Sequence, residues 1–223
     1  MALLATQDAM GKLPVPPWIR PAIGGLVVGI IALLYPHVLG VGYQATDLAL
    51  KEALPLGLML ALLLAKLVAT AVALGSGFAG GVFSPSLFLG AMAGGAFGAM
   101  ALGLFPDYAS AQGAYTVAGL GGVAAAVLGA PISTILIMFE LTNNYELTVA
   151  VMIVAVLASM LTWRFAHRSF FIWQLERRGI DFGTAQEAAL LLSVTVPKAT
   201  SLGELRRLVA YQRPQALLVV DEA

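Results

Sequence analysis

Long stretches without any charged residue constrain this chain more than any other feature. Forty residues separate Lys66 from Asp107 without a charge, and 32 more separate Asp107 from Glu140. Hydrophobic residues make up 60% of the 223 residues and charged residues only 11%, against about 25% charged in soluble domains. A membrane-spanning helix needs about 20 mostly apolar residues, so these stretches have room for several. We therefore expect an all-α polytopic membrane protein.

The charges gather in the last part of the chain. Residues 1–163 carry ten of the 24 charged residues, and residues 164–223 carry the other fourteen. Four arginines follow the last apolar run: Arg164, Arg168, Arg177 and Arg178. Short arginine-rich loops stay in the cytoplasm, so we expect an integral protein of the plasma or inner membrane with a cytoplasmic C-terminal tail. Arginines that only suit the dipole of a helix end are the alternative reading.

Composition also disfavours several classes of function. The formal net charge is zero, which gives no reason to expect a nucleic-acid partner. The absence of cysteine excludes disulfides, thiolate metal sites and thiol catalysis. Only two histidines are present, His37 and His167, and their separation disfavours a histidine metal site or a serine–histidine triad. We therefore predict that the chain is not an enzyme and needs no metal or other cofactor.

Apolar runs and chain-breaking residues predict a series of helices, several of them too short or too broken to span a membrane alone. Broken helices at membrane depth are tolerated where they are buried in protein or line a cavity, and in transporters they surround the substrate site. The predicted helices cover residues 23–34, 46–53, 55–74, 82–104, 112–127, 132–141 and 147–162.

Two features inside these helices carry separate predictions. Lys66 falls within an apolar helix, and we expect its long side chain to reach the membrane interface; a lysine of an ion pathway is the alternative. Gly90, Gly94 and Gly98 lie four residues apart on one helix face. This spacing predicts that a second helix packs closely against them.

The chain after residue 163 has a different character. Residues 170–186 are compatible with a helix that leaves the membrane, and residues 194–196, 201–211 and 217–220 with a strand, a helix and a strand. The N-terminus has no basic segment followed by a short apolar core, as a signal peptide would have. Both ends of the chain look cut, so we treat it as part of a longer protein.

The most informative segment is Gly-Ser-Gly-Phe-Ala-Gly-Gly-Val-Phe-Ser-Pro-Ser-Leu-Phe-Leu-Gly, from Gly75 to Gly90. Four of the seven residues from Gly75 to Gly81 are glycine, and a helix is expected to begin near Val82. The first six residues match the dinucleotide pattern G-x-G-x-x-G. That pattern needs a preceding strand and an acidic residue about 20 positions later. Here a membrane helix precedes it and the next acid is Asp107, so nucleotide binding at this segment is disfavoured.

The start of this helix suits an anion. A helix N-terminus leaves backbone N–H groups unpaired and carries a partial positive charge, so it can hold an anion without lysine or arginine. Val82 and Phe83 would offer their N–H groups, and the preceding glycines let the backbone approach the ion closely. Pro85 lies in the first turn, where its missing donor costs little. A purely structural hinge is the alternative.

The segment Gly81-Val-Phe-Ser-Pro85 resembles the G-x-F-x-P signature of the CLC chloride channels and chloride/proton antiporters. Three further segments are similar to that family: Pro17-Trp-Ile-Arg-Pro-Ala-Ile-Gly-Gly25, Leu39-Gly-Val-Gly-Tyr43, and Ala130-Pro-Ile-Ser-Thr-Ile-Leu-Ile-Met-Phe-Glu-Leu-Thr142 with Tyr145-Glu146. The resemblance covers about residues 14–186. It divides the chain into residues 1–186, the C-terminal half of a CLC transmembrane domain, and residues 187–223, a linker and the truncated start of a cytoplasmic CBS domain with α/β character.

The resemblance implies a chloride site built from backbone groups. CLC subunits contain two inverted halves that each direct helix N-termini at a central chloride ion, and this chain matches the second half. The chloride-binding residues then map to Gly81, Val82, Phe83 and Pro85. A tyrosine at the start of the family's last helix donates its hydroxyl to the same ion, and that position falls on Phe171, which has no hydroxyl.

The resemblance also implies partners and a function. We expect passive or proton-coupled chloride transport, as a voltage-gated channel or an antiporter, by a homodimer in the lipid bilayer that needs the N-terminal half absent here. The predicted helices at 132–141 and 147–162 map to the family's subunit interface. One alternative is another secondary transporter with broken helices, although a cation-coupled carrier would need an acid near the break. The other is a regulatory membrane subunit whose CBS tail senses an adenine nucleotide.

Overall fold

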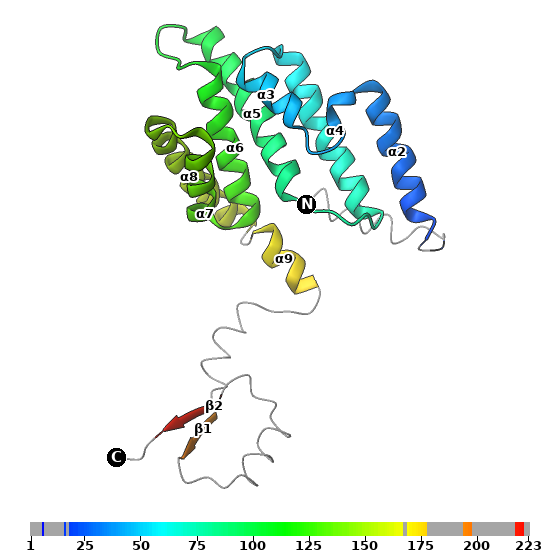
Figure 1. Ribbon diagram of the computed structural model, residues 1–223, viewed down its shortest axis with the longest axis vertical. Helices are drawn as coiled ribbons and strands as arrows, with labels where there is room; N and C mark the ends of the chain where they lie inside the picture. The colour runs from blue at the N-terminus through cyan, green and yellow to red at the C-terminus, as the bar shows by residue number, and fades with distance from the viewer. Residues whose placement is uncertain are drawn as a thin grey trace. The chain divides into compact units, whose positions relative to one another are not determined.

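The computed structural model describes Thr6, Pro16 and residues 18–166, 169–177, 194–197 and 217–220. The chain divides into two units, Met1–Phe170 and Phe171–Ala223. Helices make up the described regular structure of the first unit (Figure 1): α2 (Arg20–Leu34), the short 3-10 helix η1 (Pro36–Val38), α3 (Tyr43–Leu50), α4 (Leu56–Gly75), α5 (Phe83–Leu104), α6 (Gln112–Leu128), α7 (Pro131–Thr142) and α8 (Tyr145–Ala166). Helix α9 (Phe170–Arg177) follows, and β1 (Val194–Pro197) and β2 (Leu217–Val220) lie in the second unit.

The helices have the lengths expected of a membrane domain with broken helices. Among the described residues, α4, α5 and the helix that begins at Tyr145 are long and apolar enough to cross a membrane. Helices α2, α6 and α7 are apolar but shorter. The predicted all-α membrane fold is therefore confirmed for the first unit.

Proline, glycine and asparagine set the helix boundaries. Pro21 and Pro131 stand in the first turns of α2 and α7, where proline is tolerated because the helix needs no N–H group there. Gly129 ends α6 and Asn143 ends α7, both in the left-handed backbone region that these two residue types adopt most readily. The predicted break between the helices at 112–127 and 132–141 is thus confirmed.

One short helix was predicted with the wrong boundaries. The helix expected at 46–53 is α3, which begins at Tyr43 and ends at Leu50. Gly42 has a φ of 86°, which ends the preceding turn and allows the helix to begin directly after it. Glu52 also has a positive φ, of 58°, so the helix cannot continue through it.

Helices α5 and α6 pack closely against each other. A Cβ atom added to Gly90 would overlap the carbonyl oxygen of Gly119 and lie 2.9 Å from its carbonyl carbon. At Gly94 it would overlap the carbonyl oxygen of Tyr115 and lie 3.0 Å from the Cα of Gly119. A Cβ atom added to Gly98 would lie 3.0 Å from the Cβ atom of Tyr115. The predicted close helix packing at the glycine face is confirmed, and α6 is the helix that packs there.

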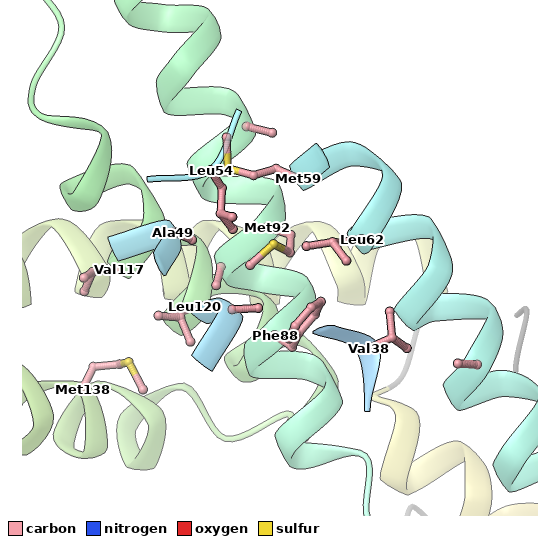
Figure 2. Close-up of a cluster of buried hydrophobic side chains, with 14 of the residues drawn as sticks. Val38, Ala49, Leu54, Met59, Leu62, Phe88, Met92, Val117, Leu120 and Met138 are labelled. Carbon is pink, nitrogen blue, oxygen red and sulfur yellow. The ribbon is translucent and has the colours of Figure 1, made fainter. Parts of the chain in front are cut away.

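A core of apolar side chains surrounds α5 (Figure 2). Phe88, Met92 and Ala96 of α5 are almost completely buried. They belong to a cluster that also contains residues of η1 and of the helices on both sides of α5: Val38, Ala45, Ala49, Met59, Leu62, Val117, Leu120, Met138 and Val151. The N-terminal part of α5 is therefore held in a well-packed environment.

The structure corrects the expectation that Lys66 reaches the membrane interface. Its side chain is only 4% exposed, and its Nζ donates hydrogen bonds of 2.7 Å to the carbonyl oxygens of Val38 and Gly40. Nζ also lies 5.1 Å from the centre of the Phe88 ring. The reason is that the turn after α2 folds back onto α4 and presents carbonyl groups to the lysine, a contact between residues far apart in the sequence.

The two predicted strands of the tail are present. β1 and β2 pair in parallel, with Val194 opposite Leu217 and Val196 opposite Val219. A parallel pair requires a crossover connection, as a strand–helix–strand unit provides. The helix predicted at 201–211 and most of the one predicted at 170–186 lie outside the described residues, and the division at residue 186 and the CBS assignment stay predictions.

Candidate functional site

The predicted site lies where α4 ends and α5 begins. Helix α4 ends at Gly75, and Gly77, with a φ of 93°, turns the chain out of the helix in a conformation that favours glycine. Residues 77–81 are exposed, whereas Val82 is buried. The glycine-rich segment therefore leads from an exposed loop into the buried first turn of α5.

Among the residues that the structure describes, no side chain caps the N-terminus of α5. Val82 occupies the N-cap position without a capping hydrogen bond. Ser84 donates its hydroxyl to the Val41 carbonyl at 3.2 Å, and Ser86 donates to the Phe83 carbonyl at 2.6 Å, so neither hydroxyl caps the helix. Within the described part of the chain, the N–H groups of Val82, Phe83 and Ser84 have no hydrogen-bond acceptor. Three neighbouring donors are thus left for a ligand or water.

In two other helices of the same chain, a side chain accepts a hydrogen bond from an N–H group of the first turn. Glu52 accepts a hydrogen bond of 3.1 Å from the N–H of Gly113 in the first turn of α6. Asn144 accepts one of 3.1 Å from the N–H of Leu147 in the first turn of α8. Helices α2, α4 and α7 also lack a side-chain cap, so an uncapped start alone does not mark a site. The start of α5 differs from these in the glycine-rich segment that precedes it.

Space for a ligand is available beside Gly81. A Cβ atom built on Gly81 would have no described atom within 4 Å. The backbone conformation of Gly81 is open to any residue, because its φ is not positive. In the described part of the chain, neither packing nor backbone geometry therefore requires a glycine at this position.

The structure brings together four of the five predicted site residues. Gly81, Val82, Phe83 and Pro85 are consecutive or nearly so at the start of α5. Phe171 lies in the first turn of α9 and belongs to the second unit, so its place beside the other four stays a prediction from the resemblance. No group of three or more metal-ligating side chains occurs among the residues that the structure describes.

Sequence reasoning missed one part of the site. The turn between α2 and α3, which includes Gly40 and Val41, contacts the first turn of α5 through the hydroxyl of Ser84. This turn falls in the segment 39–43 that carries part of the family resemblance, but nothing in its sequence shows which helix it contacts. The contact becomes visible only when residues 43 positions apart are brought together.

Comparisons with known proteins find relatives of this chain. The family model described as "Voltage gated chloride channel" matches residues 1–162. The H(+)/Cl(-) exchange transporter ClcA of Klebsiella pneumoniae is 32% identical over 165 residues, which cover 71% of this chain and 34% of that protein. The ClcA protein of Salmonella arizonae is 35% identical over 164 residues, with the same coverage. The chain thus spans about a third of the length of these curated relatives.

A solved structure supports the fold independently. The crystal structure of a slow cyanobacterial Cl-/H+ antiporter superposes with a TM-score of 0.71 at 24% identity, covering 79% of this chain and 42% of that one. At an identity this low, the similarity is evidence for the fold and for nothing further. The match of the family model over most of the chain is the decisive observation: the chain belongs to the voltage-gated chloride channel family.

Proposed function

We propose that this chain takes part in chloride transport across a membrane, as part of a CLC channel or chloride/proton exchanger. Membership of the voltage-gated chloride channel family supports the transport of chloride, and the curated relatives are named as exchange transporters, not as enzymes. The observation that supports this site is the uncapped first turn of α5, which directly follows Gly81.

A site built from backbone donors would hold an ion and still release it. The N–H groups of Val82 and Phe83 would donate to chloride, and the partial positive charge at the start of α5 would add to their attraction. No charged side chain occurs between Lys66 and Asp107 to hold the ion more strongly. Conduction needs binding weak enough for exit, which partial charges provide and a directly bound lysine or arginine would oppose.

The direct test is to locate the ion. We expect that crystals of the complete protein soaked in bromide show an anomalous peak within hydrogen-bond distance of the amides of Val82 and Phe83. Chloride efflux from liposomes that contain the protein is the matching functional assay. Bromide density elsewhere in the membrane domain, with none beside these two amides, would reject the assignment of the site.

Replacing Phe171 with tyrosine is expected to tighten chloride binding. The family resemblance implies a donor hydroxyl at this position, and a hydrogen bond to a charged group contributes about 1.5 kcal/mol, or about tenfold in affinity. Isothermal titration calorimetry with chloride measures the change. Phe170→Tyr, one position away in the same helix, serves as the matched control and should leave the affinity as it is. An unchanged affinity in Phe171→Tyr means that this residue does not face the ion.

We further propose that the protein forms a homodimer through α7 and α8. Large apolar side chains on these helices are exposed in the single chain: Ile132, Leu136, Phe139, Met152, Ile153, Val156, Leu157, Met160 and Leu161. Exposed apolar faces suit either lipid or a second subunit, and the family resemblance favours the subunit. The arginines from Arg164 onward support a cytoplasmic C-terminal tail. A second inverted half would supply the remaining groups around the ion.

A further inference from the structure

Lys66 is a buried lysine within the apolar helix α4. Its Nζ binds the carbonyl oxygens of Val38 and Gly40 and lies against the Phe88 ring. No carboxylate in the described part of the chain pairs with it. Burial of a charge without an ion-pair partner is costly, and a well-packed apolar side chain would avoid that cost. The feature that distinguishes Lys66 from an apolar residue is therefore its pair of hydrogen bonds to the turn.

The turn that Lys66 holds makes local backbone hydrogen bonds. It runs from Pro36 to Gly42, and the N–H groups of Val38 and Leu39 donate to the carbonyls of Tyr35 and Pro36. Gly40 and Gly42 both have positive φ, so the path of the turn depends on conformations that favour glycine. The two bonds from Lys66 tie this turn to α4.

The same turn contacts the start of α5 at two levels. The Val41 carbonyl accepts the hydroxyl hydrogen bond of Ser84, at 3.2 Å. One helical turn further along, Gly42 lies so close to Phe88 that an added Cβ atom would overlap the ring, with Cε2 at 2.8 Å. Figure 2 shows Phe88 in the cluster that also contains Val38. A continuous set of contacts therefore runs from Lys66 through the turn to Ser84.

We propose that Lys66 is a positioning residue for the candidate anion site. Lys66 fixes the turn, the Val41 carbonyl orients Ser84, and Ser84 sets the direction of the adjacent N–H groups of Val82 and Phe83. Lys66 itself does not touch the ion in this arrangement. The role in chloride binding rests on the proposed function, whereas the mechanical connection from Lys66 to the first turn of α5 does not.

A double-mutant cycle between Lys66→Met and Ser84→Ala tests this connection, with chloride dissociation constants measured by calorimetry on the complete protein. We expect each single substitution to weaken chloride binding roughly fivefold. The double variant should bind chloride no more weakly than the single variant with the lower chloride affinity, because both changes break the same set of contacts. If the two losses instead multiply, Lys66 acts through its charge or by another route, and the positioning role is wrong.

Two further measurements separate the possible outcomes. Lys51→Met removes an exposed lysine whose partner is Asp47, and it should leave chloride affinity unchanged. Amide hydrogen exchange of peptides covering residues 36–42 and 81–88, in the absence of chloride, should rise in both segments in Lys66→Met. A rise in residues 36–42 alone would overturn the proposal, because the turn would then not control α5.

The design also distinguishes failure of the inference from failure of the proposed function. If the unmodified protein binds no chloride but both peptides respond to Lys66→Met, the proposed function fails and the mechanical connection stands. If the unmodified protein binds chloride and the cycle is additive, the positioning role fails alone. Should Lys66→Met not fold, Ser84→Ala with Lys66 intact tests the last link of the proposal: unchanged chloride binding, or unchanged exchange in residues 81–88, would overturn it.

Discussion

Gly81→Val is expected to reduce chloride flux at least about 100-fold while the protein stays folded. The branched side chain would enter the open space beside the N–H groups of Val82 and Phe83, where the ion has to approach. A hydrogen bond to a charged group contributes about 1.5–3 kcal/mol, so the loss of two such donors reaches this size. No described atom lies within 4 Å of the new Cβ position, so this atom meets no clash, and we expect the fold to tolerate the substitution.

The measurement is chloride efflux from liposomes, with thermal unfolding as the check on folding. Gly57→Val is the matched control, because Gly57 also begins a membrane helix and a Cβ built on it meets no described atom within 4 Å. The control should transport at the unmodified rate and unfold at the unmodified temperature. Normal flux in Gly81→Val would count directly against an anion path past this residue.

Gly94→Val is expected to destabilise the protein by more than about 3 kcal/mol, or to prevent its recovery in folded form. Its Cβ would overlap the backbone carbonyl of Tyr115 and approach the Cα of Gly119, and backbone atoms of a neighbouring helix cannot rotate away as a side chain can. Helices α5 and α6 would have to separate, which would open the core next to Phe88 and Met92.

Thermal unfolding followed by circular dichroism measures this loss. Gly103→Val makes the same substitution in the same helix, at a glycine whose Cβ position is open, and we expect its stability to stay within about 0.5 kcal/mol of the unmodified protein. Equal unfolding temperatures for Gly94→Val and Gly103→Val would show that the close contact of α5 with α6 does not hold the fold together.

Local sequence signals were sufficient to predict most helices. Uncharged stretches located the membrane helices, and Pro131, Gly129 and the glycine-rich segment after α4 marked where helices begin and end. The predicted ranges 55–74, 82–104 and 112–127 correspond to α4, α5 and α6 to within one residue at each end. The start of α5 as a set of open backbone donors also followed from the sequence, because helix ends leave N–H groups unpaired in any fold.

Contacts between distant residues could not be predicted in the same way. A lysine inside an apolar helix has two physical solutions, reaching the interface or binding polar groups within the protein. The choice for Lys66 depends on the turn at residues 36–42, which folds back onto α4. The residue at which α3 begins depends on the positive φ of Gly42, and a glycine in the sequence permits such a conformation without requiring it.

The bare main chain at the start of α5 has a consequence for pH dependence. Amide N–H groups do not gain or lose protons over any physiological range, and residues 67–106 contain no titratable side chain. The affinity of this first turn for an anion should therefore be the same in acid and in neutral solution. Acid sensitivity of transport, where it is measured, must originate in groups outside this stretch.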